Sequence, residues 1–589
     1  MDQLADNEIR IIELLPGEEG APIRCEARVE LESGEMEYEA LSYVWGNHLN
    51  QATIEVSGRS LQITKTLHTA LSRLRLSDEP RSLWIDQLCI NQDDLKEKAA
   101  QVQKMRSIYS NCTRCLIWLG EVDAALEMPD AVNAVSFLEC LASTVGPSTD
   151  DYKQARSRLE SMPTFLSAMQ ALRSISVQDC PWWHRVWTVQ ESILPSDKAF
   201  IWGPLQITWD TLVNASEAWV SGACDDWLDG EYWDVAIEAG GLGHFLAKII
   251  WIRIAEGDNH DLFQSMIRWR SRKATDPLDN IYALTGLHTP GEFPRIEKCD
   301  YSLSVVRLYS EFTVDLINKF GLIVLGFDPR LEPEIATPGV PRWALDMKSW
   351  PNHTIFHWYI YWGYGYYHAN DGLTTVPVEH NTEDNTLGLS GSLVDTVKLI
   401  GDGYYFTEEE GGQPPVSLLK SWLELYIRDL ESSTRDTSST YPPSISPSTT
   451  ATAIRAFSKL VIGESIQNPP EWQFEREATD EDVDNVTKFI ETGSEEFRDS
   501  SISGMARNQR FFVTENGMMG IGHLDTRPGD EVWVFSLGEL PFVVRPKTQG
   551  GTLTEHFDFV GQCYVQGIMQ GEMFKQDESK PPQRTIQIH

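Results

Sequence analysis

The sequence predicts an α/β N-terminal domain with a mostly parallel sheet, a mainly helical middle region and a small antiparallel β unit near the C-terminus. Short apolar strands alternate with amphipathic helices over residues 38–119. Apolar residues recur at helical spacing over much of residues 209–320, and from residue 510 the pattern changes to the period of two that is typical of antiparallel strands. At 589 residues, the chain is also too long for one ordinary domain.

The N-terminal domain is predicted from a strand–helix–strand unit. Residues 83–85 are a short apolar strand that ends at Asp86, and residues 115–119 are the next apolar strand. Between them, apolar side chains recur at helical spacing along residues 94–109, and Asp94 is placed to cap this helix. Because parallel strands need a crossover connection of this kind, we expect most of the sheet to be parallel.

Composition and periodicity divide the chain into six segments. We expect, in order, an N-terminal extension, the α/β domain, the helical middle region, a mixed α/β connecting region, a Ser/Thr/Pro-rich and acidic linker, and the C-terminal β unit, at residues 1–35, 36–205, 206–330, 331–431, 432–500 and 501–575. Within the linker, residues 471–499 hold 3 basic and 11 acidic residues, which predicts an exposed and partly flexible segment. In the last segment, an Asn516–Gly517 turn predicts a hairpin.

The charge of the chain excludes one class of partner. Its 49 Lys and Arg residues against 87 Asp and Glu residues give a net charge of −38. Because affinity for phosphate backbones comes largely from basic side chains, we expect no nucleic-acid partner. Residues 38–194 hold 15 basic and 18 acidic residues, so the N-terminal domain is close to neutral and can accept an anionic ligand.

Other classes are disfavoured by missing patterns. We expect no membrane span, because no stretch reaches the roughly 18 apolar residues that one requires. The nine cysteines are scattered, which favours reduced thiols in a cytosolic or nuclear protein, and we expect a cytoplasmic location. Cys112 and Cys115 are the only close pair, so we expect no metal site. The serine-hydrolase elbow, the phosphate-binding Walker loop and the His-Glu-x-x-His zinc motif are missing from the sequence.

Several blocks of the sequence resemble the fungal heterokaryon incompatibility (HET) domain. The blocks follow one another in the order of that family at residues 38–46, 83–92, 101–109, 118–120 and 183–191. Residues 272–286 and the C-terminal β unit are similar to regions that commonly follow a HET domain. The resemblance implies a role in fungal non-self recognition, in which an unidentified protein partner triggers regulated cell death.

HET domains in turn resemble TIR domains, and this sequence keeps the order of the TIR features. A first strand at residues 38–43, a strand ending at Asp86 and a Trp187-x-x-x-Glu191 helix occur in that order, with Thr188 where TIR domains have a cysteine. The resemblance implies a TIR-like, flavodoxin-like fold. It also implies that Glu191 is the catalytic residue of an NAD-cleaving site, that NAD is the substrate, that no cofactor is required and that the active form is a homo-oligomer.

The NAD hypothesis predicts a binding slot around Glu191. Its candidate binding residues are Tyr43, Trp45, Asp86, Arg185 and Trp187. A carboxylate beside the ribose can hold its hydroxyls and stabilise the positive charge that develops when nicotinamide leaves. Tyr43 and Trp45 follow the first strand, and ligands of open α/β sheets bind at this carboxyl edge.

Each candidate residue also has a structural interpretation. Glu191 could be an exposed helix residue or the ion-pair partner of Arg185, Asp86 could cap a loop, and Trp187 could belong to the core. The rival function, from a different class, is a non-catalytic signalling or scaffold module that works through protein–protein contacts. A third is a regulatory nucleic-acid or metabolite binder built on the helical middle region.

Overall fold

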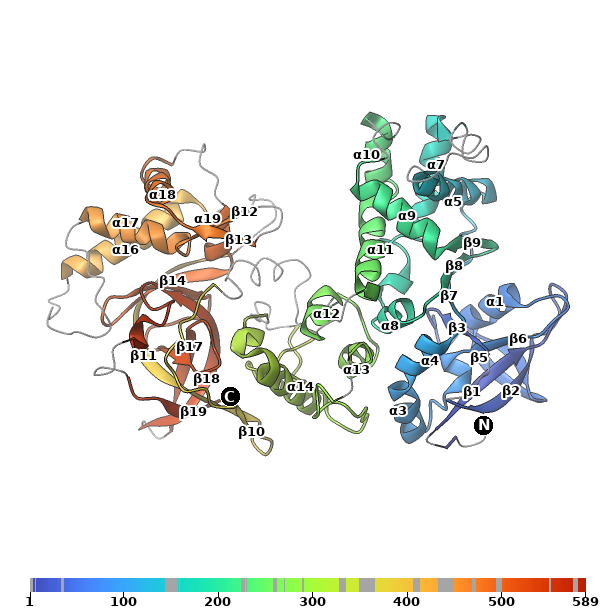
Figure 1. Cartoon of the computed structure of the whole chain (residues 1–589), viewed down its shortest axis with the longest axis horizontal. Coiled ribbons are helices and arrows are strands. Elements are labelled where there is room, and N and C mark those ends of the chain that lie inside the picture. Colours follow the sequence, from blue (N-terminus) through green and yellow to red (C-terminus); the bar gives the residue numbers. More distant parts are fainter. Residues whose placement is uncertain are drawn as a thin grey trace. The chain divides into compact units, whose positions relative to one another are not determined.

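The computed structural model of the protein consists of two compact units (Figure 1). Unit 1 comprises Met1–Glu292 and Glu297–Ser302, and unit 2 comprises Phe293–Ile296 and Leu303–His589. The residues that the structure describes are 4–5, 7–32, 37–143, 157, 159–223, 228, 230–257, 262–269, 271–288, 291–327, 335–348, 366–405, 414–432, 450–468, 473–493, 500–549, 552–575 and 581–589.

A nine-stranded mixed sheet with the order β5-β4-β2-β1-β6-β3-β7-β8-β9 forms the centre of unit 1. Its strands are β1 Glu8–Leu14, β2 Arg24–Leu31, β3 Glu39–Ser42, β4 Gln51–Val56, β5 Arg59–Thr64, β6 Arg81–Trp84, β7 Arg114–Gly120, β8 Lys198–Trp202 and β9 Leu205–Thr208. Among these described strands, four of the eight pairings are parallel: β2–β4, β3–β6, β3–β7 and β7–β8. The expectation of a mostly parallel sheet is therefore correct for the centre and wrong for the flanks, where two hairpins and β9 add antiparallel pairings.

The four central strands have a recognisable topology. They lie in the order β6-β3-β7-β8, and each is parallel to its neighbour. When they are numbered along the chain, this order is 2-1-3-4, which is how a flavodoxin-like sheet begins. The carboxyl ends of β3 and β6 therefore lie at the same edge, which is the edge where such sheets bind ligands.

The expected N-terminal extension contributes two strands to this sheet. β1 pairs with β6 on one side and with β2 on the other. Arg10 of β1 is buried, and its guanidinium forms an ion pair with Glu97 at 3.1 Å and donates a 2.5 Å hydrogen bond to the carbonyl of Cys89. Residues 8–31 are thus part of the α/β domain, although their pattern alone does not show which strand they join.

The helices of unit 1 cover the sheet and extend it into a helical block. They are α1 Lys65–Leu74, α2 Asp86–Cys89, α3 Leu95–Gln103, α4 Met105–Asn111, α5 Met128–Ser143, α7 Met162–Arg173, η1 Pro181–His184, α8 Thr188–Ile193, α9 Trp209–Val220, α10 Gly230–Glu238, α11 Leu242–Gly257, α12 Leu262–Trp269 and α13 Asp279–Thr285. α5, α7, α9, α10 and α11 form a block beside β8 and β9 (Figure 1, teal to green). The helix expected over residues 94–109 is divided at Lys104 into α3 and α4, and Asp94 caps its start.

Among the described residues, no single helix is long and apolar enough to cross a membrane. Within these residues, only α10 and α11 taken together, with a bend of 68° between them, reach the length and apolar composition of a membrane span.

Unit 2 contains a β-barrel. Its strands are β10 Glu379–Asn381, β11 Thr386–Tyr404, β14 Gln509–Thr514, β15 Met519–His523, β16 Glu531–Phe535, β17 Phe542–Gln549, β18 Thr552–Val565 and β19 Arg584–Ile588. The pairings β11–β14–β15–β18–β17–β16–β11 close into a ring, because β11 pairs with β16 along its first half and with β14 along its second half. The expected hairpin at the Asn516–Gly517 turn is confirmed as β14 and β15. The antiparallel unit is larger than expected, since it also takes β10, β11 and β19.

Helices pack around this barrel. They are α14 Val305–Phe320, η2 Leu322–Phe327, α16 Val416–Ser432, α17 Thr450–Val461, α18 Asp480–Thr492, α19 Ser500–Ala506 and η5 Glu572–Phe574, and a short β12 Ser465–Asn468 and β13 Gln473–Glu477 pair accompanies them. The acidic segment expected to be exposed contains α18, whose Val483, Val486 and Phe489 belong to a core cluster with α16 and α17. Its acidic side chains occupy the other face of an amphipathic helix. Residues 433–449 of the expected linker lie outside the described residues.

Candidate functional site

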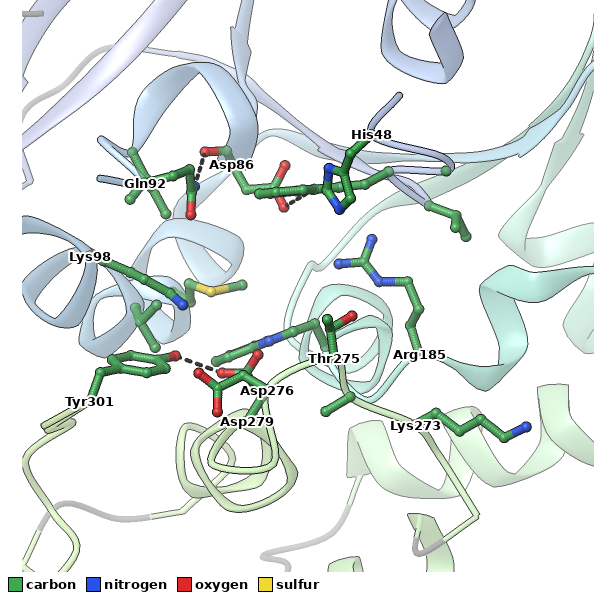
Figure 2. A pocket seen from close by; sticks show the side chains of 18 residues that line it. His48, Asp86, Gln92, Lys98, Arg185, Lys273, Thr275, Asp276, Asp279 and Tyr301 are labelled. Carbon is green, nitrogen blue, oxygen red and sulfur yellow. Dashed lines mark hydrogen bonds between the residues drawn. The ribbon is translucent and has the colours of Figure 1, made fainter. Parts of the chain in front are cut away.

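A cavity of about 460 Å³ lies at the carboxyl edge of the central strands of unit 1. It is lined by Val44, Trp45, Gly46, His48, Asp86, Ile90, Gln92, Lys98, Val102, Met105, Arg185, Trp187, Lys273, Ala274, Thr275, Asp276, Asp279 and Tyr301. Three basic and three acidic side chains are among them (Figure 2). In that view Asp86 and His48 lie above the hollow, Asp276 and Asp279 below it, and Lys98 and Arg185 on opposite sides.

The upper wall is built where two neighbouring strands end. Trp45 follows β3, and Asp86 follows β6 and begins α2. The indole Nε1 of Trp45 donates a 2.7 Å hydrogen bond to Oδ2 of Asp86, and the backbone N–H of Gln87 donates to Oδ1 at 2.7 Å. Both carboxylate oxygens therefore have a donor, which fixes the orientation of the carboxylate at the cavity surface.

Arg185 is held at the side of the cavity by the turn between η1 and α8. One Nη1–H donates to the backbone carbonyl of Tyr43, and this contact ties the turn to the end of β3. The backbone of Lys273 pairs with the same turn, because its carbonyl accepts from Val186 N–H at 2.9 Å. Because a guanidinium carries five donors in a fixed fork, the single bond to Tyr43 leaves others that suit an anionic ligand.

The lower wall comes from the chain between α12 and α14. Asp279 is buried, and its Oδ1 accepts a 2.7 Å hydrogen bond from the hydroxyl of Tyr301. The Nζ of Lys98 lies 4.1 Å from the centre of the Tyr301 ring, which joins this wall to α3. Burial raises the pKa of Asp279, while hydrogen bonds from Tyr301 and Trp187 lower it. Asp279 thus fixes two aromatic rings at the cavity surface.

Glu191 is buried and does not line the cavity. Its side chain is 3% exposed, and its Oε2 accepts a short hydrogen bond from the hydroxyl of Ser42 at the end of β3. The Ser42 oxygen in turn accepts a 2.8 Å hydrogen bond from Nε1 of Trp182. This geometry rules out the interpretation of Glu191 as an exposed helix residue.

Burial raises the pKa of three titratable groups near this edge, Glu191, Asp86 and Tyr43. It raises the pKa of Glu191 to about 7, although Arg185 and the Ser42 hydrogen bond act in the opposite direction. It also raises the pKa of Asp86, against the opposing effects of Arg185 and Trp45. Burial and the charge of Asp86 together raise the pKa of Tyr43, whose hydroxyl donates to Gln87 at 3.2 Å. A carboxyl group with a pKa near 7 changes its protonation state at physiological pH.

The structure brings four of the candidate residues to one surface. Trp45, Asp86, Arg185 and Trp187 line the cavity, while Tyr43 and Glu191 are buried just behind it. Sequence reasoning missed the charged residues Lys98, Lys273, Asp276 and Asp279 together with His48 and Tyr301. The sequence signal for the lower wall is the stretch 272–286, which resembles the region that commonly follows a HET domain.

The described residues contain no group of three or more His, Cys, Asp or Glu side chains that could hold a metal ion. The eight cysteines within them are free thiols. The cavity instead combines cationic groups, carboxylates and aromatic rings, and this combination suits an organic anion with a planar ring and hydroxyl groups.

Comparisons with known proteins define the class. Residues 38–191 match the family model described as heterokaryon incompatibility protein (HET), and residues 456–581 match the Het-6 β-barrel domain. The chain therefore contains a HET domain and a Het-6 β-barrel domain at these residues. It is 25% identical over 631 aligned residues to heterokaryon incompatibility protein 6, OR allele, of Neurospora crassa, and the alignment covers 91% of this chain and 90% of that protein. No solved structure matches the chain.

Proposed function

We propose that this protein acts in fungal heterokaryon incompatibility and that the cavity of unit 1 binds and cleaves NAD. The first part rests on the HET and Het-6 barrel matches and on the similarity to the Neurospora protein, which extends over nine-tenths of both chains. The second part rests on one observation. Asp86 and Arg185 face a common hollow at the carboxyl edge of a sheet whose central strands have the order of flavodoxin-like folds.

The chemistry of the cavity fits a dinucleotide. Arg185 and Lys98 supply positive charge for the pyrophosphate, and the carboxylate of Asp86 can accept hydrogen bonds from ribose hydroxyls. The rings of Trp45 and Trp187 supply apolar faces for a planar base. Cleavage of the nicotinamide–ribose bond develops positive charge on the sugar, which nearby carboxylates stabilise.

Glu191 keeps the catalytic assignment that the TIR resemblance implies, with a condition set by its position. Its carboxylate is buried, does not line the hollow and accepts a hydrogen bond from Ser42, so contact with the ribose requires a rearrangement of Ser42 or of the turn that carries Arg185. Assembly into a homo-oligomer is one event that supplies such a rearrangement. The burial of Glu191 also favours the rival proposal, a non-catalytic signalling module in which Glu191 stabilises the fold.

The experiment uses the full-length protein. Wild type and Glu191→Gln are incubated with NAD at several protein concentrations, and nicotinamide release is measured by chromatography. Catalysis predicts release that rises more than linearly with protein concentration and a loss of at least about a hundredfold in Glu191→Gln. Asp93→Asn, an exposed carboxylate in the loop after α2, is the matched control and should keep the wild-type rate.

Two outcomes contradict the catalytic proposal. One is no release from wild type at any concentration, and the other is equal release from wild type and Glu191→Gln. If Glu191→Gln also preserves cell death in a fungal incompatibility assay, the signalling module is the better description of unit 1.

A further inference from the structure

We propose that Arg272, which lies outside the segment matched by the HET family model, is a positioning residue of Glu191: together with Arg185, it supplies buried positive charge that favours the ionised form of the Glu191 carboxylate. The proposal rests on the proposed function only in treating Glu191 as the catalytic carboxylate. It assigns a site role to a residue of the chain that follows α12, beyond the end of the matched residues 38–191.

Arg272 is an unusual cation, because its side chain is 5% exposed. Its Nη1–H donates a 3.0 Å hydrogen bond to Oγ1 of Thr188, and its guanidinium lies 5.2 Å from the centre of the Trp269 ring. Nε and Nη2 of Arg272 are buried and have no hydrogen-bond partner within the part of the chain that the structure describes. A buried guanidinium with so few bonds needs an opposite charge nearby.

Glu191 is the carboxylate that meets this need. Thr188 and Glu191 are three residues apart on α8, so they share one face of the helix, and Arg272 contacts that face through Thr188. Burial lowers the pKa of Arg272 to about 9, and the charge of Glu191 opposes this effect. The influence is mutual: burial raises the pKa of Glu191, and the charges of Arg185 and, to a smaller extent, Arg272 lower it.

The same contact fixes the lower wall of the cavity. The hydroxyl of Thr188 accepts from Arg272 and donates a 2.7 Å hydrogen bond to the carbonyl of Arg185. The next residue, Lys273, pairs with the backbone on either side of Arg185. Arg272 therefore links Glu191, Arg185 and the lower wall, and the HET-matched segment by itself lacks this link.

The test measures the protonation of Glu191 directly. The full-length protein is titrated from pH 5 to pH 9, and the infrared absorption of protonated carboxyl groups is recorded. The Glu191 band is identified as the one absent from Glu191→Gln, so the measurement uses no NAD. The groups that face Glu191 and titrate or carry charge are Asp86, Arg185, Arg272, Tyr43, Tyr109 and Cys115. Only the first three affect the carboxylate below pH 9, because the pKa values of the tyrosines and the cysteine are raised by burial.

Arg272→Met should raise the midpoint of the Glu191 band by about one pH unit or more, as expected for the loss of a nearby opposite charge. Arg272→Lys retains the positive charge, so its midpoint should lie within about 0.3 pH unit of the wild-type midpoint. Arg114→Met removes an exposed arginine of the same unit, which is ion-paired with Asp197 at 2.6 Å, and should leave the midpoint unchanged.

A folded Arg272→Met with the wild-type midpoint overturns the proposal. If Arg272→Met does not fold, Arg272→Lys decides, because a midpoint as high as about one unit above wild type shows that the charge at this position does not control Glu191. If wild type cleaves NAD, the acidic limb of its pH–rate profile should shift upward with the band in Arg272→Met. A wild type without cleavage removes the proposed catalysis and leaves the infrared result standing.

Discussion

Trp45 and Asp86 are joined by a 2.7 Å hydrogen bond between the indole Nε1 and Oδ2, across the neighbouring ends of two parallel strands. The bond makes the two strand ends one rigid surface, with an aromatic face and a carboxylate side by side. Because the acceptor is a carboxylate and the donor is neutral, the bond also favours the ionised form of Asp86.

Trp45→Phe should weaken NAD binding by roughly tenfold, because it keeps an aromatic face and removes the donor to the Asp86 carboxylate, a bond of about 1–2 kcal/mol. Isothermal titration calorimetry of the full-length protein measures the affinity. Trp251→Phe, a partly exposed tryptophan of α11, is the control and should bind NAD as wild type does. Equal NAD affinities of Trp45→Phe and wild type would mean that the Trp45 hydrogen bond to the Asp86 carboxylate does not contribute to ligand binding.

The stability of unit 1 should depend on pH through Glu191. The group has a pKa of about 7 in the folded state against 4.5 as the reference, so the folded protein binds the proton more tightly than the unfolded chain. This stabilisation is full below pH 4.5 and is lost as the pH rises through 7, for a total of roughly 3 kcal/mol. Because glutamine has no titrating carboxyl group, the stability of Glu191→Gln should not contain this pH-dependent contribution.

Urea unfolding at pH 5 and pH 8 measures this difference. Between pH 5 and pH 8, wild type should lose roughly 2.5 kcal/mol of unfolding free energy through this group, and Glu191→Gln should show no such loss. The comparison of slopes cancels the fixed effect of the substitution on the Ser42 hydrogen bond. Parallel pH dependences in the two proteins would show that Glu191 does not titrate in this range.

The buried ion pair between Arg10 and Glu97 predicts a large effect at the expected N-terminal extension. Arg10→Met leaves the Glu97 carboxylate buried without its cation and should destabilise unit 1 by about 3–5 kcal/mol. Arg24→Met, on the adjacent strand, breaks an exposed pair with Glu55 at 3.7 Å and should cost less than about 1 kcal/mol. Equal losses in urea unfolding would mean that β1 is not an integral part of the sheet.

Two glycines of β15 predict unequal effects in the barrel. A Cβ at Gly520 would lie 2.2 Å from the ring of Phe512, whereas one at Gly522 would have nothing closer than 3.2 Å. Gly520→Ala should therefore destabilise the barrel by about 1–3 kcal/mol, and Gly522→Ala by clearly less. Thermal unfolding followed by near-ultraviolet circular dichroism reports the order, and a reversal would contradict the packing of Phe512.

Local patterns predicted the elements that local physics determines. The strand that ends at Asp86, the Asp94 cap and the hairpin at Asn516–Gly517 depend on neighbours within a few residues, and all three are present in the structure. The parallel centre also followed from the strand–helix–strand spacing. The place of β1 between β2 and β6 did not, because it depends on a partner strand far along the chain.

The candidate site was predictable in part for the same reason. Trp45 and Asp86 could be paired because the ends of parallel strands share an edge. The lower wall with Asp279 and Tyr301 could not, since its approach is fixed by tertiary contacts such as the Lys273 pairing with the turn at Arg185. The depth of Glu191 was also hidden, because a helix periodicity does not report what covers the helix.

The double pairing of β11 has a consequence for the order of events during synthesis. Residues 391–404 of β11 pair with β16 and β14, and the ring closes only when β14, β15, β16, β17 and β18 have all been synthesised. The last of these strands, β18, ends at residue 565. The strands and helices of unit 1, by contrast, are all translated by residue 302. Because domains fold as units as they leave the ribosome, we expect the cavity-bearing unit to be formed while the barrel is still an open set of strands. Contacts so distant in sequence also make barrel closure the slow step of folding.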